Sequence, residues 1–265
     1  MTHVSQIERE GRRESIIGRV LPPPDHQVRR QESHVREVRE FDRDTFNVIG
    51  FIPGTGSFTA SRQGAGMDSQ AIIVSAYYDG LGVGPDGTLY PGANDNASGV
   101  AAMLEMARLL NHSPYQPKRT VVFIAWAGGE RGEGLSLENV MGARPGFSLF
   151  TPEAVLELSG LGAGSGESIA LGDGSSFRLV RLYQDAAGRA GASTTTRGRG
   201  PHYRLYAPPG FGGRSALSLY ASWDGSDRTA HTPADDVEAI DPDKLERVGQ
   251  STLLTLLVLS REVNY

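Results

Sequence analysis

From Asn47 onward, short apolar runs alternate with amphipathic helical patterns, and this alternation constrains the fold more than any other feature of the chain. Each run has the length of a buried strand and is rich in Val, Ile or aromatic residues. The runs are Phe46 to Ile52, Ala71 to Tyr77, Thr120 to Ala127, Ala154 to Leu158 and Ala216 to Ala221. Strands that alternate with helices predict an α/β fold with a largely parallel or mixed sheet, covered on both faces. The functional loops of such a sheet lie at the carboxyl ends of its strands.

Three helices are expected beside these strands. The first follows the cluster Asn94-Asp95-Asn96, which can cap it, and has apolar residues at helical spacing from Val100 to Ala107. The second spans Phe177 to Ala190. The third opens at Asp241-Pro242, with Asp as the N-cap and Pro at the first helical position, and runs to about Val263.

The 265 residues are divided by no Pro-, Ser- or Gly-rich linker, which favours one large domain. Residues 1–45 carry charges of both signs and the break Pro22-Pro23-Pro24. We interpret them as a charged N-terminal arm with a helical part, a turn and an exposed strand or helix. Residues 46–265 are expected to form the domain proper.

Composition excludes several classes of function. The net charge of −5 argues against a nucleic-acid partner, because such partners need a basic surface. The chain has no cysteine, so disulfides, thiolate metal sites and a cysteine nucleophile are excluded. The strongly apolar run from Leu253 to Leu259 is far short of the roughly 20 residues of a membrane span, so we expect no membrane insertion by this chain. The first residues also lack the apolar core of a secretory signal.

One glycine motif matches a dinucleotide fingerprint in form only. Gly82 to Gly87 follows a predicted strand, but Pro85 and Asp86-Gly87 favour a turn, and the residues after it cannot open a helix. We therefore do not expect a nucleotide site there.

Three segments place metal-type ligands just past a predicted strand or in a loop near one. They are Gly92 to Gly99, Trp126 to Glu130, and Ala230 to Asp236. One histidine with two carboxylates is an acceptable zinc set that leaves a fourth position for water. By composition alone, however, His231 is more often a solvated loop histidine than a ligand.

In their order along the chain, AIIVSAYYDG, GANDNASGVAAMLEMARLL, TVVFIAWAGGERGEGL and HTPADDVEAID resemble the zinc exopeptidase family of bacterial leucyl aminopeptidases, aminopeptidase S and glutaminyl cyclases. The resemblance covers roughly Asn47 to the C-terminus. It implies a three-layer αβα sandwich with a mixed, mostly parallel sheet of about eight strands. It also implies a bacterial, extracytoplasmic peptidase-like domain, and the short lead-in before Asn47 suggests a domain excised from a larger protein that could itself be membrane-anchored.

The resemblance assigns roles to seven positions. The family's HxD motif reads Tyr77-Tyr78-Asp79 here, so the histidine ligand of the first zinc is replaced by Tyr77. Asp79, which in the family orients that histidine, is expected here to be a hydrogen-bond acceptor that holds the loop. The family's bridging aspartate is Asp95, and its pair of adjacent glutamates, general base and then ligand, reads Gly129-Glu130. A further aspartate ligand aligns with Ser159, and the last histidine ligand is His231.

These losses predict a degenerate metal centre. Tyr77 and Ser159 are poor zinc ligands, so at most one zinc is expected, on Asp95, Glu130 and His231. A positioned general base contributes roughly 10²- to 10⁴-fold in rate, and Gly129 cannot act as one. We therefore expect weak or no peptidase activity and a binding or structural role, with a peptide or protein as a possible ligand.

The alternative is an active one-zinc enzyme, either an aminopeptidase or a glutaminyl-cyclase-like acyl transferase, that uses a non-standard base. Glu133 is one candidate for this base, and Asp79, Asp224 and Asp227 are others. Substrate specificity would be set by loops such as Arg197 to Gly213. A third reading, in which the three residues hold no metal and serve only as polar packing, also stands at this point.

Overall fold

A computed structural model describes the side chains of residues 47–56, 66–130, 151–172, 176–197 and 217–262, together with the backbone of Phe46, Asp173 and three strands nearer the N-terminus. The expected candidate Glu133 and most of the loop from Arg197 to Gly213 lie outside these residues.

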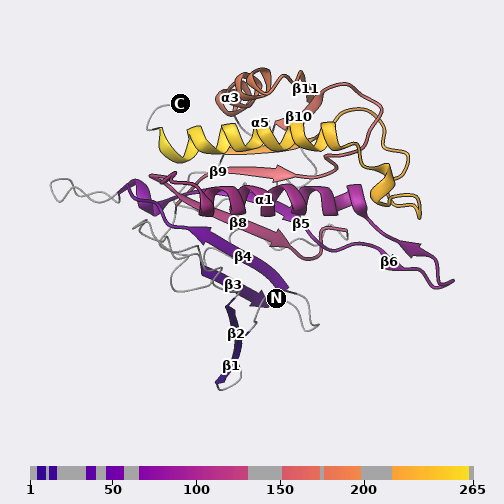
Figure 1. Cartoon of the computed structure of the whole chain (residues 1–265), viewed down its shortest axis with the longest axis horizontal. Coiled ribbons are helices and arrows are strands. Elements are labelled where there is room, and N and C mark those ends of the chain that lie inside the picture. Colours follow the sequence, from indigo (N-terminus) through magenta and orange to yellow (C-terminus); the bar gives the residue numbers. More distant parts are fainter. Residues whose placement is uncertain are drawn as a thin grey trace.

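Eight strands of the described chain form one mixed sheet, in the order β11-β10-β12-β9-β5-β8-β4-β3 (Figure 1). The strands are β3 (His34–Arg39), β4 (Phe46–Ile52), β5 (Gln70–Tyr77), β8 (Thr120–Trp126), β9 (Thr151–Leu158), β10 (Ile169–Asp173), β11 (Thr194–Arg197) and β12 (Leu217–Trp223). Strands β12, β9, β5 and β8 are parallel neighbours, and β10 and β11 are also parallel. The pairs β10–β12, β4–β8 and β3–β4 are antiparallel. The expected sheet of about eight strands, mixed and mostly parallel, is therefore confirmed.

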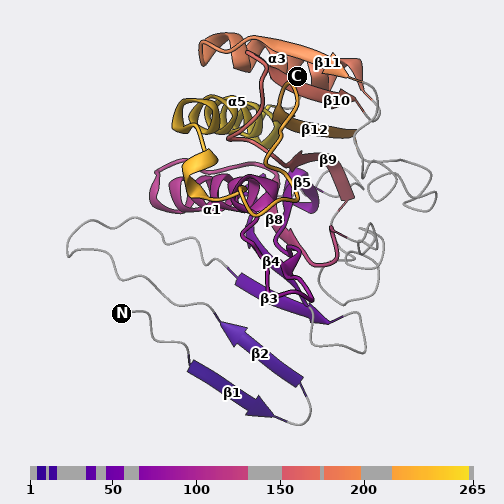
Figure 2. The same ribbon diagram turned by 90° about the vertical axis from the view of Figure 1, so that its right-hand side faces the viewer.

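Three described helices lie side by side on one face of this sheet, as Figure 2 shows: α1 (Ser98–His112), α3 (Phe177–Arg189) and α5 (Pro242–Arg261). On β5, Ile72 and Val74 point to this side and join an apolar cluster with Met103 of α1 and Leu256 of α5. Ile73, which points to the opposite side, is also fully buried. Both faces of the central strands are thus covered, as a three-layer sandwich requires.

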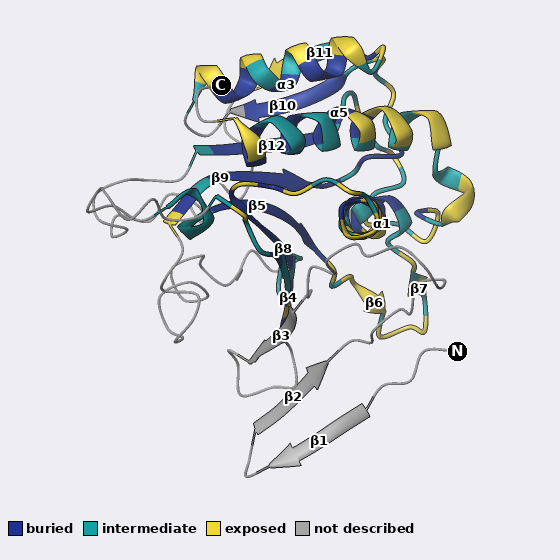
Figure 3. Cartoon of the chain, turned by 60° about the vertical axis from the view of Figure 1, so that its left-hand side comes forward, coloured by how far each residue is buried: buried dark blue, intermediate teal, exposed yellow. Residues whose placement is uncertain are grey.

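The helix ends follow the caps predicted from the sequence. Asp241 accepts a hydrogen bond from the backbone amide of Asp243 at 3.0 Å, with Pro242 in the first turn of α5. At α1 the Asn96 side chain accepts from the amide of Gly99 at 3.2 Å, so the cluster at 94–96 does contact the start of this helix. Figure 3 shows that the central strands β5 and β9 are mostly buried, whereas the outer surfaces of the helices are exposed.

The described part of the arm before residue 46 consists of strands. No helix is described there. Strands β1 (Ser5–Arg9) and β2 (Arg12–Ile16) form an antiparallel hairpin, and β3 pairs with β4 as the edge of the main sheet. The mixed charges of the arm have no helical periodicity that could have ruled out strands. Residues 17–33 and 40–45 lie outside the described part of the chain, so the expected helical part stays a prediction there.

The glycine motif after β5 forms a second small hairpin. Strands β6 (Gly82–Val83) and β7 (Leu89–Tyr90) are antiparallel, and the amide of Gly87 donates to the carbonyl of Gly84 at 2.9 Å in the turn between them. The turn predicted from Pro85 and Asp86-Gly87 is confirmed. Among the described helices, none is both long enough and apolar enough to cross a membrane.

Candidate metal centre

The residues singled out from the sequence meet at one edge of the sheet. Strands β5, β8, β9 and β12 are parallel, so their carboxyl ends lie at the same edge. Tyr77 ends β5, Glu130 follows β8, Ser159 follows β9 and His231 lies in the segment after β12. Asp95 comes from the turn Ala93–Ala97, directly before α1.

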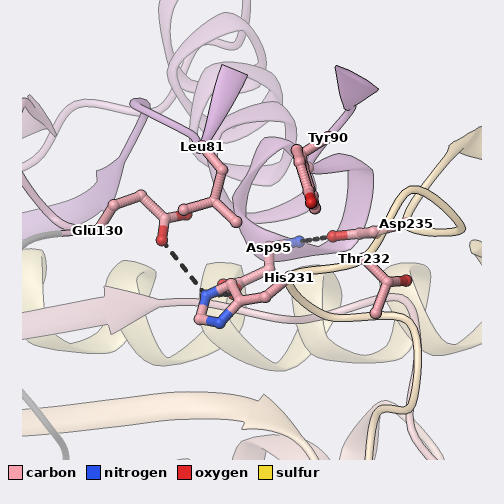
Figure 4. Close-up of a pocket in the computed structure, with 8 residues that line it drawn as sticks. Leu81, Tyr90, Asp95, Glu130, His231, Thr232 and Asp235 are labelled. Atoms are coloured by element: carbon pink, nitrogen blue, oxygen red, sulfur yellow. Dashed lines mark hydrogen bonds and ion pairs between the residues drawn. The ribbon is translucent and has the colours of Figure 1, made fainter. Parts of the chain in front are cut away.

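Three of these side chains converge into one group (Figure 4). The Nε2 atom of His231 lies 3.0 Å from Asp95 Oδ2 and 3.3 Å from Glu130 Oε2. One ligand atom of each residue lies within 4.8 Å of the other two. Zinc bonds of about 2.0 to 2.2 Å in a tetrahedron place ligand atoms roughly 3.3 to 3.6 Å apart, so the donor set and its spacing fit a zinc ion.

The charges of the group also favour a cation. Glu130 is half-buried, and its pKa is raised by burial and by the negative charge of Asp95, against the lowering effect of His231. Asp79 and Asp235 raise it further. A carboxylate that is destabilised in this way is stabilised when a positive ion binds it.

Asp235 anchors the candidate ligand Asp95. Its side chain is 1% exposed, and its two carboxylate oxygens accept hydrogen bonds from the amides of Asn94 and Asp95, at 2.7 and 3.1 Å. Its carbonyl accepts from the amide of Ala93 at 3.0 Å. Asp235 therefore joins the loop of His231 to the loop of Asp95. The sequence placed Asp235 in a candidate segment but gave it no role, because its partners lie some 140 positions away.

Asp79 anchors Glu130, the second acidic candidate ligand, in the same manner. Its Oδ1 accepts from the amide of Gly129 at 2.9 Å and its Oδ2 from the amide of Glu130 at 3.2 Å. Since both oxygens are used, Asp79 holds the segment that carries Glu130. This is the loop-holding role expected of Asp79 once the histidine ligand is lost.

His231 is held by its own loop. Its side chain is 61% exposed, and its backbone has a φ of 59°, in the left-handed region that non-glycine residues seldom adopt. Thr232 closes the turn, because its amide and its hydroxyl both donate to the carbonyl of Thr229, at 2.9 and 2.6 Å. Residues outside the favoured backbone regions cluster at functional sites, where surrounding contacts hold them.

Tyr77 occupies the remaining side of Asp95. Its hydroxyl donates a short hydrogen bond to Asp95 Oδ1 and accepts one from Ser159 Oγ at 3.3 Å. Burial, together with the hydrogen bond to Asp95, raises the pKa of Tyr77 far above the physiological range. Tyr77 is therefore a neutral hydrogen-bond donor, which makes it a poor zinc ligand.

Residues 57–256 match the model of peptidase family M28. The chain belongs to this family. Among solved structures, LapB from Legionella pneumophila aligns with a TM-score of 0.68 at 20% identity, over 89% of this chain and 61% of LapB. The zinc aminopeptidase BSAP from Bacillus subtilis aligns with a TM-score of 0.62 at 23% identity, over 83% of this chain and 52% of that one. Porphyromonas gingivalis glutaminyl cyclase has a TM-score of 0.60 at 17% identity, over 85% of this chain and 82% of the cyclase. These likenesses show the fold.

Curated relatives match short parts of this M28 chain. A probable zinc metalloprotease from Pyrenophora tritici-repentis is 60% identical over 42 residues, which cover 16% of this chain and 9% of the protease. The uncharacterized protein YfbL from Escherichia coli is 45% identical over 65 residues, or 24% of this chain and 20% of YfbL. The chain thus spans only a small part of the length of these relatives, and about three fifths of LapB.

Two of the candidate bases for this M28 domain are engaged elsewhere. Asp224 forms an ion pair with Arg197 and accepts from the amide of Gly225 at 2.7 Å. Asp227 accepts from the side-chain amide of Asn94 at 2.7 Å and from the Thr229 hydroxyl at 2.6 Å. Both carboxylates therefore have structural partners.

An apolar rim adjoins the three converging side chains. Leu81 and Tyr90, from the two ends of the β6–β7 hairpin, line one pocket with Asp95, Glu130 and His231 (Figure 4). Neither residue was a candidate from the sequence, although Leu81 directly follows the YYDG segment at the end of β5.

Proposed function

We propose that this M28 domain has a degenerate centre that holds a single zinc ion on Asp95, Glu130 and His231, that it hydrolyses peptides weakly or not at all, and that it serves to bind a peptide or protein ligand. The observation that carries this proposal is the contact of Tyr77 with Asp95. The neutral phenol uses the carboxylate oxygen that a second ion would need. The spacing of the three remaining donors supports one ion.

A bound zinc ion lowers the pKa of a water ligand and polarises a carbonyl oxygen. The residues of this chain would supply the ion's three ligands and hold them through Asp79 and Asp235. The remaining requirement of peptide hydrolysis is a group that takes a proton from water. Gly129 stands where the resemblance places that group, and Asp79, Asp224 and Asp227 use their oxygens in other hydrogen bonds.

Zinc content and hydrolysis test the proposal together. The chain is dialysed against micromolar zinc, its metal is counted by elemental analysis, and hydrolysis of aminoacyl p-nitroanilides is measured with zinc or cobalt present. We expect one zinc per chain and no turnover above the blank. The double variant Asp95→Ala/His231→Ala is the control and should bind none.

Three results contradict the proposal. Two zinc ions per wild-type chain would show a complete centre, and absence of zinc would leave the three residues as polar packing. Robust metal-dependent turnover that Glu130→Ala abolishes would favour the active one-zinc enzyme, and replacement of each candidate base would then locate the proton acceptor.

A further inference from the structure

The Tyr77 hydroxyl lies between the two groups that the family resemblance would place on a first metal ion. It contacts Asp95 Oδ1 on one side and Ser159 Oγ, at 3.3 Å, on the other. The tyrosine is 8% exposed, at the buried end of β5. A hydroxyl group can donate one hydrogen bond and also accept, and here the carboxylate receives the proton while the serine supplies one. The Tyr77 hydroxyl therefore fills the place of the first metal ion, and it both donates and accepts a hydrogen bond there.

We propose that Tyr77 is a positioning residue that substitutes for a second metal ion. Its hydroxyl stabilises Oδ1 of Asp95 in the place of a cation, and so leaves Oδ2 directed at His231 and the single ion. This inference rests on the proposed function in one respect, because the ion that Oδ2 binds is the proposed zinc. Groups that hydrogen-bond to a metal ligand fix its orientation, and their loss typically weakens metal binding by about 10- to 100-fold.

The same tyrosine requires glycine at position 129. A Cβ atom built on Gly129 would overlap Cβ and Cγ of Tyr77, and it would lie 2.8 Å from Cδ2. Cβ and Cγ form the stiff base of the side chain, so the overlap cannot be relieved by a small rotation of a flexible end. The backbone at 129 therefore packs directly on Tyr77. Because Glu130 follows at once, this packing also helps to set the position of a ligand.

Tyr77 and Gly129 thus form one packed unit. The loss of the histidine ligand and the loss of the general base are linked changes, since a residue with a side chain at 129 needs the loop to move away from β5. In this structure the loop is fixed to Asp79 by two amides, and one of them belongs to Gly129.

The first test measures zinc affinity of the full chain by competition with a chelating dye. Tyr77→Phe keeps the ring and removes the hydroxyl, and we expect one zinc per chain with a Kd raised by about 10- to 100-fold. The matched control is Tyr183→Phe, which removes a buried hydroxyl that bonds to Thr252 between α3 and α5, and its Kd should equal that of the wild type. The d–d absorption of bound cobalt should shift only in Tyr77→Phe. An unchanged Kd and spectrum in Tyr77→Phe would overturn the positioning role.

The second test restores the first site. Tyr77→His/Ser159→Asp supplies the two ligand types that the resemblance places there, and we expect one zinc more than in the wild type. Ser159→Asp alone should gain none, because the phenol still fills the position. A gain in the single variant would contradict the substitution by Tyr77. Melting curves report whether each variant is folded.

The third test needs no metal. Gly129→Ala should lower the melting temperature of metal-free protein, and the loss should be clearly smaller in a Tyr77→Gly background, where Cβ, Cγ and Cδ2 are all gone. Gly80→Ala is the control, because a Cβ at Gly80 meets no atom within 4 Å. Equal losses in the two backgrounds would overturn the packed unit. A wild-type chain that binds no zinc overturns the proposed function and the positioning role with it, whereas this third test still decides whether Tyr77 and Gly129 form one packed unit.

Discussion

At the scale of single residues, the candidate centre is built by carboxylates that hold other carboxylates through the backbone. Asp79 and Asp235 each accept two consecutive amides, and the second amide of each pair belongs to Glu130 or Asp95. The anchoring hydrogen bonds are thus made to the backbone of each candidate ligand, so its side chain remains available to bind an ion. A buried acceptor with two amide donors is costly to replace, because the amides lose their partners.

Asp235→Asn tests this anchoring. The amide group of asparagine turns one acceptor oxygen into a donor that faces an amide of Asn94 or Asp95, so one hydrogen bond is lost. We expect about 1 to 3 kcal/mol less stability toward urea and zinc binding weakened by roughly 10- to 100-fold. The neighbouring Asp236→Asn is the control, since the Asp236 side chain makes no capping hydrogen bond. Equal effects of the two variants would refute the anchor.

Asp227 gives a prediction for pH. Burial alone would raise its pKa, but hydrogen bonds from Thr229, Asn94 and Ala230 outweigh burial and leave the pKa lowered. A lowered pKa in the folded state contributes stability that is present above the unfolded pKa of about 3.9 and is lost as pH falls through the folded value. The stability cost of Asp227→Asn should therefore be larger at pH 7 than at pH 2.5. Urea titrations at both values measure it, and a cost that does not fall at low pH contradicts the prediction.

At the scale of elements, the glycines of two helices have opposite roles. Gly99 lies in the first turn of α1, where a Cβ would meet Asn96 Oδ1 at 2.5 Å and the carbonyl oxygen of Leu158 at 2.6 Å. This close approach lets α1 start beside the end of β9, which places the Asp95 turn at the edge of the sheet. Gly249 lies inside α5, where a Cβ meets nothing within 4 Å. The first glycine is required by packing, whereas nothing in the surroundings of the second requires it.

Replacement of these glycines should change stability in opposite directions. Gly249→Ala should raise the free energy of unfolding by about 0.5 to 1 kcal/mol, because alanine has the higher helix propensity. Gly99→Ala should lower it, because Asn96 or the end of β9 must shift. Thermal melting of each variant, compared with the wild type, measures the direction of each change. Stabilisation by Gly99→Ala would mean that the α1 start is less tightly packed than its contacts indicate.

At the scale of the whole molecule, the three candidate ligands join segments that are far apart in the sequence. Asp95 precedes α1, Glu130 follows β8 and His231 follows β12, so a bound ion would link three loops at one edge of the sheet. An ion that binds only the folded chain stabilises it by mass action. Zinc affinity can therefore be measured as an increase in the free energy of unfolding of the whole chain.

Zinc should therefore raise the melting temperature. At a free zinc concentration of 100 times Kd, the free energy of unfolding should increase by about 2.7 kcal/mol. EDTA should reverse the shift, and His231→Ala should abolish it. A shift that persists in His231→Ala would place the ion elsewhere.

Central elements could be predicted from the sequence, whereas the edges and the contacts of the site could not. Strand β5 is a continuous apolar run, and helix α5 has apolar residues at helical spacing behind an Asp-Pro start. Local sequence rules recognise both. Edge strand β11 reads TTTR, which has no apolar pattern, and β1 and β2 are strongly charged. The candidate ligands came from the resemblance, since composition alone favoured a solvated His231. The contacts of Tyr77 with Asp95 and of Asp235 with two amides depend on how distant loops meet, and no local pattern encodes them.

The packing of Tyr77 on Gly129 also limits the routes by which such a chain can change. A codon change that installs glutamate at 129 is harmful while the tyrosine remains, because the new side chain collides with it. Loss of the tyrosine alone removes the partner of Asp95 and supplies no base. By the resemblance, two-metal chemistry needs changes at Tyr77, Gly129 and Ser159 together, and a change at Tyr77 or Gly129 alone disturbs the site as it stands. Tyr77 and Gly129 therefore have to change together, and a series of single substitutions does not separate them.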